Sequence, residues 1–437
     1  MPRALAKEIV IAAGLRSAQT KAGGQFRRED AGRLGAAVTR ELLARTGLDA
    51  AQLDEVIFGC VGQPQNQVNV ARVIAIRAGV PQRVPAHTVG RNCASGMQAL
   101  TSAVLQIEAG RGELFLCGGV EVMSAYPLTY GPEMTSMFEQ LSKARTLPAR
   151  LAALASFRPW HLKPRVALLE GLTDPTCGLI MGRTAELLAR DWSITREQGD
   201  ALALESHTRA ERARANGRFA REIAPVLPLG ARDGAQSVLA DDGIREGQSL
   251  EALAKLKPYF EKPDGVVTVG NSSQITDGAC ALLVTTAERA RALGLAPLAR
   301  VRSFAWAGCE PARMGLGPVY ASAAALDDAG CELKDLGAIE LNEAFAHQVL
   351  ACARAFDSAQ FAARELGRAR ALGALDPART NINGGAIALG HPVGCTGARL
   401  LLTLAHQLRE SNAELGLATL CIGGGQGGAV VLERCGA

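Results

Sequence analysis

The chain has 437 residues, of which 48% are hydrophobic and 21% charged, so it is long enough for two or three domains or one large duplicated one. Its net charge of +4 is small for that length, and no basic block is interleaved with aromatic residues, which argues against a nucleic-acid partner. The 11 cysteines are odd in number and have no C-x-x-C spacing, which favours reduced thiols in a cytoplasmic enzyme over a disulfide framework or a metal site.

The first part of the chain alternates predicted strands with predicted helices. We expect strands at residues 8–13, 53–58 and 113–117, and helices at 30–47, at 71–78 and directly behind Cys93. Gly118 and Gly119 are expected to form a small-residue turn after the third strand. Strands that alternate with helices predict an α/β fold. No stretch approaches the ~18 apolar residues that a membrane helix needs, and the apolar run at 9–13 is too short for a signal sequence.

Cys93 lies among small residues directly ahead of an apolar helix, in the segment 91–97 (RNCASGM). Unpaired N–H groups and the positive end of the helix dipole favour an anion at such a position. We therefore expect the Cys93 thiol to lose its proton more easily than usual and to act as a nucleophile. The alternative is a buried structural cysteine, which is common for a lone cysteine.

Between about residues 124 and 250 the strand–helix rhythm stops, which predicts an insertion with two clear helices at 181–190 and 196–217. Within it, residues 134–169 mix apolar side chains with Lys and Arg in a basic amphipathic pattern. Such a surface could cover the phosphates of a nucleotide, contact a membrane surface or dock a partner protein. A solvated helical cap is the plainer alternative.

The second half of the sequence repeats features of the first. The apolar spacing of residues 53–58 recurs at 336–341, and each of these segments follows a helix and a glycine. Cys395 opens a helix as Cys93 does, and each of the two helices is followed by a strand that ends in cysteine and glycine. The helix at 398–408 carries leucines on nearly every side, which indicates burial all round. We therefore expect a duplicated α/β unit with two central helices between two sheets.

Two further segments carry candidate chemistry. Asn342 follows a predicted strand, where its amide can hold a water molecule or donate to a carbonyl, or can simply cap the next helix. His391 lies in a Gly/Pro-rich turn ahead of a helix, where a neutral imidazole can accept a thiol proton. Because duplication places His391 at the equivalent of the Cys93 loop, we expect the two loops to face each other.

Residues 421–428 (CIGGGQGG) contain a G-x-G-x-x-G spacing, which raises the question of a dinucleotide site. Such a site needs a following helix and a further strand, whereas residues 429–432 are predicted to form a strand close to the end of the sequence. We reject the dinucleotide site. The segment is instead a loop with a second cysteine, Cys421, and with backbone N–H groups that can form an oxyanion hole.

Taken together, these segments resemble the thiolase family of acyltransferases over nearly the whole chain. The matching segments are 92–96 (NCASG), 342–346 (NEAFA), 391–399 (HPVGCTGAR) and 421–425 (CIGGG), together with 270–273 (GNSS) and 276–279 (TDGA). The resemblance implies a duplicated five-layer α-β-α-β-α fold with an inserted loop domain that binds coenzyme A. It divides the chain into an N-terminal half (1–124 and 250–293), an inserted loop domain (125–249) and a C-terminal half (294–437).

The resemblance also implies roles for individual residues. Cys93, deprotonated by His391, attacks the keto carbon of a 3-ketoacyl-CoA, and Cys421 protonates the acetyl-CoA enolate and then activates CoA. One oxyanion hole consists of His391 with a water molecule held by Asn342, and the other of the N–H groups of Cys93 and Gly423. A further match places Ser273 near the pantetheine arm of CoA. CoA acts as a substrate, and no metal or permanently bound cofactor is implied.

Two positions depart from familiar types within the family. Ile180 stands where many short-chain biosynthetic thiolases have a histidine that contacts CoA, which resembles the thiolase subunit of the fatty-acid β-oxidation complex. That subunit, however, often has histidine where this chain has Asn342. We expect degradative thiolysis of 3-ketoacyl-CoA, with acetyl-CoA condensation to acetoacetyl-CoA as the alternative. A condensing enzyme for carrier-bound acyl groups, which typically lacks the base Cys421, and an inactive acyl-CoA-binding subunit are the remaining alternatives.

The expected partners follow from the same resemblance. The substrates and products are 3-ketoacyl-CoA, acetyl-CoA and CoA, and the chain is expected to form a homodimer or homotetramer. The basic segment 134–169 is expected to contact a hydratase/dehydrogenase subunit or an anionic membrane surface, and to help admit longer acyl chains. The protein is expected in the cytoplasm, without a nucleic-acid partner.

Overall fold

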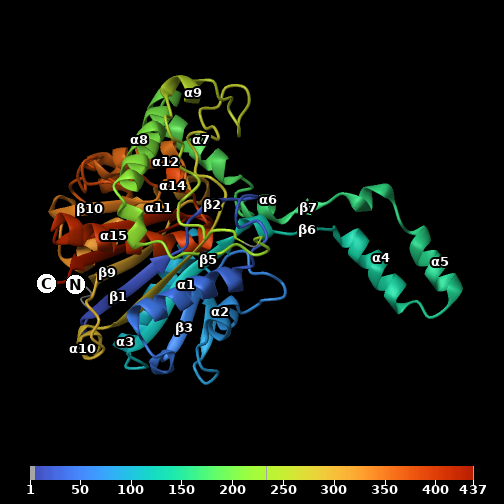
Figure 1. The fold of residues 1–437 in the computed structure, drawn as a ribbon. Coiled ribbons are helices and arrows are strands. Elements are labelled where there is room, and N and C mark those ends of the chain that lie inside the picture. The colour runs from blue at the N-terminus through green and yellow to red at the C-terminus, as the bar shows by residue number, and fades with distance from the viewer. Residues whose placement is uncertain (1–4, 233, 437) are drawn as a thin grey trace.

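The computed structural model describes residues 5–232 and 234–436, and its main strands form one long mixed sheet (Figure 1). The strand order across the sheet is β10-β11-β12-β9-β1-β8-β5-β3-β4, and the short strand β2 pairs with β8. The bounds are β1 (Ile9–Arg16), β2 (Thr20–Lys21), β3 (Glu55–Gly59), β4 (Ala86–Val89), β5 (Leu114–Val122), β8 (Thr276–Thr286), β9 (Ala299–Gly308), β10 (Leu336–Leu341), β11 (Leu415–Ile422) and β12 (Gln426–Arg434).

The sheet consists of two half-sheets that repeat one pattern of pairing. In the first half, β3 is parallel to β5, and β8 is antiparallel to both β5 and β1. In the second half, β10 is parallel to β11, and β12 is antiparallel to both β11 and β9. The halves meet where β1 pairs with β9 through Val10 with Arg300 and Ile11 with Ala299. The duplication expected from the sequence is confirmed, and β4 is an additional edge strand of the first half.

Helices form three layers around the two half-sheets. The central layer is α3 (Ser95–Glu108) and α15 (Val393–Ser411), whose apolar residues share one core with the inner faces of both half-sheets. The helices α1 (Ala31–Thr46) and α2 (Val70–Ala78) cover the outer face of the first half-sheet. The helices α11 (Gly317–Ala329) and α12 (Ala346–Phe356) cover the outer face of the second. This is the predicted α-β-α-β-α architecture, and α15 is buried on nearly all sides, as its leucines indicated.

Strand residues alternate between the cores, as the period of two in a β-strand requires. Ile57 of β3 faces the central helices, whereas its neighbours Val56 and Phe58 face the outer helices α1 and α2. The same strand therefore supports two layers at once, and a shift of register by one residue would exchange the two faces.

The two central helices cross at a pair of glycines near their N-termini. A Cβ atom on Gly96 would lie 2.8 Å from the backbone nitrogen of Ala398, and one on Gly397 would lie 2.6 Å from that of Met97. Larger residues at these two positions would push the helices apart, because close-packed backbones cannot absorb an added carbon. The glycines thus bring the Cys93 turn and the His391 turn to the same end of the central layer.

The insertion between the β5 and β8 strands contains a body part and a projecting arm. The arm consists of α4 (Pro132–Lys143) and α5 (Leu147–Ala155), joined to the body through the two-stranded ladder of β6 (Leu128–Thr129) and β7 (Arg165–Val166) (Figure 1). The part of the insertion that packs on the main body contains α6 (Ala167–Gly171), α7 (Met181–Asp191), α8 (Arg196–Ala215) and α9 (Leu250–Ala254). Three short helices lie elsewhere in the chain: α10 (Ala287–Ala292), α13 (Ala359–Glu365) and α14 (Ala386–Leu389). Among the described residues, no helix is both long and apolar enough to cross a membrane.

Local sequence signals located several elements well. Asp30 caps α1 by accepting a hydrogen bond from the N–H of Arg33, and Gly47 ends this helix in the left-handed region at φ 64°. The strand β12 directly follows the Cys421 loop, so the strand predicted at residues 429–432 is confirmed, where a dinucleotide fingerprint would need a helix.

Three expectations were wrong. Gly118 and Gly119 form no turn but lie inside β5, where a Cβ on Gly119 would lie 2.1 Å from the carbonyl oxygen of Gly394. These glycines therefore permit the close approach of α15. The edge strand β4 was missed because it is short and none of its residues is fully buried. The segment 134–169 is not one surface, because the arm ends before β7 and α6 returns to the body.

Candidate active site

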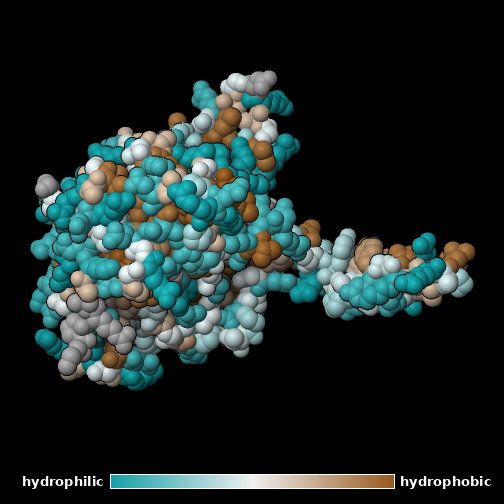
Figure 2. Space-filling model, turned by 90° about the horizontal axis from the view of Figure 1, so that it is seen from below, coloured by the Kyte–Doolittle hydropathy of each residue, from teal (hydrophilic) through white to brown (hydrophobic). Residues whose placement is uncertain are grey.

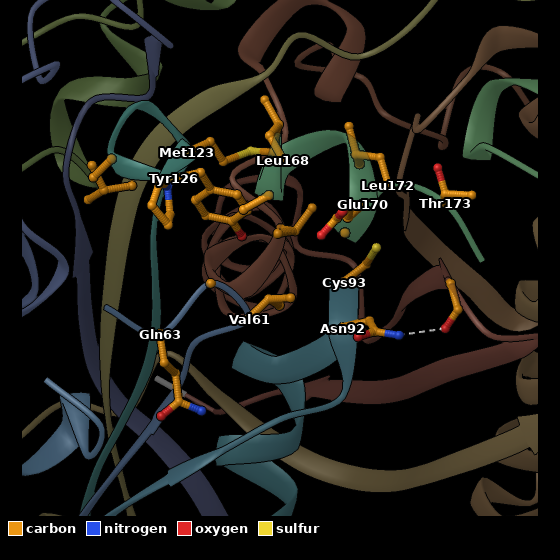
Figure 3. Close-up of a pocket in the computed structure, with 18 of the residues that line it drawn as sticks. Val61, Gln63, Asn92, Cys93, Met123, Tyr126, Leu168, Glu170, Leu172 and Thr173 are labelled. Atoms are coloured by element: carbon orange, nitrogen blue, oxygen red, sulfur yellow. Dashed lines mark hydrogen bonds between the residues drawn. The ribbon is translucent and has the colours of Figure 1, made fainter. Parts of the chain in front are cut away.

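Cys93 lies in a single 3₁₀ turn, Asn92–Ala94, that leads directly into α3. Its side chain is half-buried and its sulfur points into a cavity (Figure 3). Asn92 holds this turn in place, because its Nδ2 donates a hydrogen bond to the carbonyl oxygen of Gly423 at 2.7 Å. Asn92 adopts φ 43°, which is unusual for a residue other than glycine and indicates a conformation that the surroundings impose.

The sequence predicted a Cys93 thiol that loses its proton easily, and the structure reverses that expectation. Burial raises the pKa of the Cys93 thiol above its usual value. The backbone N–H groups of Gly423 and of Cys93 itself lower this pKa, and the charge of Glu121 adds to the increase. Desolvation therefore outweighs the helix N-terminus, and the thiol needs a base to become a thiolate.

His391, the base expected from the sequence, lies in the turn ahead of α15, and its role as a base stays a prediction. Its Nδ1 lies 2.7 Å from the hydroxyl oxygen of Thr396, and that hydroxyl donates its own proton to the carbonyl oxygen of Pro392 at 3.1 Å. With the hydroxyl proton donated to Pro392, we assign the ring proton to Nδ1, which leaves Nε2 with a free lone pair. Nε2 is buried and makes no hydrogen bond within residues 5–232 and 234–436. Burial lowers the pKa of His391 to about 3, and the nearby Arg399 lowers it further, so the ring is neutral near pH 7.

Asn342 is fully buried at the end of β10. Its backbone N–H donates to the carbonyl oxygen of Thr419 at 3.0 Å, which fixes the main chain. Neither polar atom of its side chain makes a hydrogen bond to any residue that the structure describes. A buried amide usually has partners, and one without any is a candidate for binding a substrate oxygen or a water molecule.

Cys421 is buried near the end of β11, with 1% of its surface exposed. Burial raises the pKa of its thiol well above the usual value, and the neighbouring Cys93 thiol adds to this increase. Cys421 packs in a small apolar cluster with Phe345 and Met181. The structure therefore brings together Cys93, Cys421 and the Gly423 N–H, which the sequence had placed in two distant motifs.

Ser273 lies apart from the cavity that contains Cys93. Its backbone N–H donates to the carbonyl oxygen of Ala344 at 3.0 Å, so it lies beside the loop that follows Asn342. Its side chain is partly exposed, and it is not among the residues that line the cavity. The contact of Ser273 with CoA stays a prediction.

A cavity of about 1040 Å³ opens from Cys93 between the first half and the insertion. In Figure 3 the Cys93 sulfur points toward Leu168, Glu170 and Leu172, with Met123 and Tyr126 on the neighbouring wall. Among the described residues that line this cavity, none is Lys or Arg. The lining is mainly apolar, so the cavity suits a hydrocarbon chain better than a phosphate.

Sequence reasoning missed Thr396 and gave no role to Asn92. Thr396 lies in the first turn of α15, so the spacing from His391 was visible, but only the fold shows that the hydroxyl reaches Nδ1. The described residues contain no group of three or more His, Cys, Asp or Glu side chains arranged to hold a metal ion.

Comparison with known proteins finds two family matches that follow one another along the chain. The family described as thiolase, N-terminal domain, matches residues 9–288, and the family described as thiolase, C-terminal domain, matches residues 295–434. An acetyl-CoA acetyltransferase of Pseudomonas aeruginosa is 44% identical over 98% of this chain and 100% of its own length. A 3-ketoacyl-CoA thiolase of Escherichia coli is 42% identical over 98% of this chain and 100% of its own length.

A solved structure shares the fold over the full length. The human mitochondrial 3-ketoacyl-CoA thiolase in complex with CoA superimposes with a TM-score of 0.85 at 33% sequence identity, covering 100% of both chains. The fold predicted from the sequence is therefore matched by an experimental structure.

Proposed function

The chain belongs to the thiolase family, and we propose that it cleaves 3-ketoacyl-CoA with CoA to give acetyl-CoA and an acyl-CoA shortened by two carbons. The observation that carries this proposal is the second thiol: Cys421 lies close enough to Cys93 for the Cys93 thiol to raise its pKa. A carbon–carbon cleavage through an acyl-cysteine needs one thiol as nucleophile and a second acid–base group for the departing enolate.

The first half-reaction uses Cys93 and His391. Nε2 of His391 takes the proton of Cys93, and the thiolate attacks the keto carbon of the substrate. The N–H groups of Cys93 and Gly423, which already act on the sulfur, are placed to stabilise the oxyanion of the tetrahedral intermediate. The bond between C2 and C3 then breaks, and its electron pair forms the enolate of acetyl-CoA.

The second half-reaction uses Cys421. Its thiol protonates the enolate carbon, which releases acetyl-CoA and leaves Cys421 as a thiolate. This thiolate takes the proton of an incoming CoA, whose sulfur attacks the acyl group on Cys93. Cys93 leaves as a thiolate and recovers its proton from His391, so the enzyme returns to its starting state. Asn342, whose side chain has no partner within the described chain, supports the thioester oxygen of the enolate together with His391.

The electrostatics of the site support this order of events. Burial raises the pKa of both thiols and lowers the pKa of His391, so all three groups are neutral before substrate binds. A neutral imidazole can accept a proton, and a neutral thiol can donate one. The charged intermediates therefore form only when a substrate oxygen takes up the developing negative charge.

The cavity beside Cys93 supports a substrate with a long acyl chain. Its volume of about 1040 Å³ exceeds what an acetyl group occupies, and its lining offers no cation for the phosphates of CoA. We place the acyl chain in this cavity and the pantetheine arm on the side of Ser273. The name of the Pseudomonas aeruginosa relative supports the reverse reaction, condensation of acetyl-CoA, as the alternative. The same residues would serve both directions.

The test is thiolysis of a series of 3-ketoacyl-CoA substrates with four to sixteen carbons, run with wild type, Cys93→Ala and Cys421→Ser. We expect turnover across the series for the wild type, no acyl-enzyme for Cys93→Ala, and loss of most cleavage for Cys421→Ser. Cys421→Ser should still be acylated by acyl-CoA at Cys93, as detected by mass spectrometry. Acyl groups on another cysteine, or near-normal turnover of Cys421→Ser, would overturn the proposal.

The proposal also covers the oligomeric state and the cellular compartment. The strand β4 lies at the edge of the sheet and its side chains are only half-buried, so we propose that it pairs with its copy in a homodimer or in a homotetramer built from such dimers. All eleven cysteines are free thiols, which supports a reducing compartment such as the cytoplasm.

The projecting arm supports a docking function. Between residues 132 and 164 it carries five Lys or Arg residues against two Glu residues, and Figure 2 shows hydrophobic patches along it. Its exposed large apolar side chains are Phe138, Leu147, Leu151, Leu154, Trp160 and Leu162. Short amphipathic helices with basic residues and an exposed Trp are typical of elements that lie on an anionic membrane. We propose that the arm docks on such a surface. The test must distinguish this from contact with a hydratase/dehydrogenase subunit.

A further inference from the structure

Glu121 is a fully buried carboxylate of β5 that joins the two halves of the active site. One of its oxygens, Oε2, accepts hydrogen bonds from the N–H of Val61 at 3.0 Å and from the N–H of Gly394 at 2.9 Å. The other, Oε1, accepts from the N–H of Gly62 at 2.8 Å. Val61 and Gly62 form a wall of the cavity, whereas Gly394 belongs to the first turn of α15, three residues after His391.

Two side chains complete the surroundings of this carboxylate. The hydroxyl of Tyr126 donates to Oε1 at 2.9 Å, and the sulfur of Cys60 lies 3.9 Å from the same oxygen. Three of the five partners are backbone N–H groups, which can only donate, and an ionised carboxylate can accept from all five. Burial raises the pKa of Glu121, while the N–H groups of Gly62, Val61 and Gly394 and the Tyr126 hydroxyl lower it, so the donors offset part of the desolvation cost.

The carboxylate also acts on the nucleophile through space. Its negative charge is one of the causes that raise the pKa of the Cys93 thiol. Cys93, Val61, Gly62 and Tyr126 all line the same cavity, so Glu121 lies directly behind the wall that faces the reacting sulfur. Burying a charge costs free energy unless hydrogen bonds or an ion pair compensate it, and here the backbone N–H donors supply those hydrogen bonds.

We propose that Glu121 is a positioning residue for the thiolase reaction: its carboxylate holds the Val61–Gly62 wall against the first turn of α15, so that His391 and Cys93 keep the geometry that proton transfer needs. This inference rests on the proposed function, because the proton transfer belongs to that mechanism. Glu121 does not touch the substrate and acts only through the groups that it holds. Misplacing reacting groups by about 1 Å can cost about a hundredfold in rate.

The test compares Glu121→Gln with Glu121→Asp. Glutamine keeps the shape but removes the charge and turns an NH₂ group toward backbone N–H donors, whereas aspartate keeps the charge but is too short to reach both Val61 and Gly394. We expect kcat to fall about 10- to 100-fold in both variants, with a smaller change in KM. The rate of Cys93 alkylation by iodoacetamide should show a lower pH midpoint in Glu121→Gln only, because that variant alone removes the charge beside the thiol.

The alkylation profile separates failure of this inference from failure of the proposed function, because it needs no thiolysis. Glu186→Gln is the matched control: Glu186 is also a buried carboxylate and accepts from the N–H groups of Val266 and Val267, at 2.9 and 3.0 Å. It should leave the alkylation midpoint unchanged. If Glu121→Gln does not fold, Glu121→Asp and Tyr126→Phe carry the test, and both should lower kcat without moving the midpoint. Near-normal kcat in Glu121→Asp, or an unmoved midpoint in folded Glu121→Gln, would overturn the inference.

Discussion

Nδ1 of His391 lies 2.7 Å from the hydroxyl oxygen of Thr396, and from this contact we assign Nε2 as the nitrogen that would accept a proton in the proposed mechanism. The hydroxyl has one proton, and it donates that proton to the carbonyl oxygen of Pro392. It can therefore only accept from Nδ1, which leaves Nε2 unprotonated. A second contact fixes the turn, since the backbone N–H of His391 donates to the hydroxyl oxygen of Thr276 at 2.6 Å. The ring is thus held in one orientation and one tautomer.

The first prediction concerns Thr396→Val. Valine has a similar shape but cannot accept from Nδ1, so the tautomer with a free Nε2 loses its support. We expect kcat to fall at least about tenfold, with KM changed less, because proton transfer is affected more than binding. Thr396→Ser keeps the hydroxyl and should restore most of the rate.

Thr101→Val serves as the matched control for this variant, because the buried Thr101 hydroxyl donates only within its own helix, to the carbonyl oxygen of Gln98. It should leave kcat near the wild-type value. Equal effects of Thr396→Val and Thr101→Val would show that the Thr396 hydroxyl does not select the tautomer.

The second prediction concerns chain length. Leu172 lines the cavity beside Cys93, and Leu172→Trp would fill part of the space that we assign to the acyl chain. Burial of one CH₂ group is worth about 0.8 kcal/mol, or about fourfold in affinity, so excluding several groups should lower kcat/KM for a sixteen-carbon substrate more than tenfold. The four-carbon substrate should change by less than about threefold.

Leu154→Trp, on the exposed arm, is the matched control for added bulk and should leave the whole series unchanged. A uniform loss across all chain lengths in Leu172→Trp would place the acyl chain elsewhere.

The candidate active-site residues could be named from the sequence because each lies in a short motif whose chemistry is local, and their catalytic roles stay predictions. Cys93 precedes a helix, His391 lies in a tight turn, and Cys421 precedes a run of glycines. Duplication also predicted that two of these loops would meet, and the glycine crossing of α3 and α15 shows the physical means. The fold class followed from the alternation of strands and helices together with the resemblance to the thiolases.

Properties that depend on tertiary packing could not be predicted in this way. The raised pKa of Cys93 results from burial, which no local motif reveals. In the sequence, nothing distinguishes Glu121 from other residues near a strand. Its five hydrogen-bond partners come from segments up to 273 residues away along the chain. The edge strand β4 has no buried face, so its pattern was weak. The domain boundaries at 124, 249 and 293 stay predictions.

The third prediction concerns stability in acid. His347 of α12 is fully buried, and neither ring nitrogen makes a hydrogen bond of good geometry with a described residue. Burial lowers the pKa of His347 to about 4. The unfolded chain then binds more protons than the folded chain between about pH 4 and 6.5, so the stability that the neutral ring permits is lost as pH falls through this range.

His347→Leu should remove this contribution. Leucine has a similar volume and no polar atoms to bury, so the variant should be at least as stable as wild type at pH 7. The difference in unfolding free energy between His347→Leu and wild type should be about 2 kcal/mol larger at pH 5 than at pH 7. Urea unfolding at the two pH values measures this, with His161→Leu in the projecting arm as the control. A gain that does not grow between pH 7 and pH 5 would show that His347 is not a source of acid sensitivity.

The last prediction concerns the arm, which the structure allows to be removed cleanly. Thr129 and Arg165 pair at the base of the arm, so residues 131–163 can be replaced by an Asn-Gly turn that joins Tyr130 to Pro164. This excision keeps α6 and therefore the cavity wall at Leu168 and Leu172. We expect short-chain thiolysis to be retained and binding to anionic liposomes to be lost.

A charge variant separates the two forces that hold the arm on a membrane. Replacing Arg145, Arg150, Arg158 and Lys163 by Gln should weaken binding to anionic liposomes at least about tenfold and leave the weaker binding to neutral liposomes unchanged. The same contrast should shrink as salt rises, because exposed charges are screened over about 8 Å at physiological ionic strength. Retained liposome binding by the excised protein would assign the arm to a protein partner or to a purely structural role. Loss of a purified hydratase/dehydrogenase partner, with liposome binding intact, would assign it to that partner.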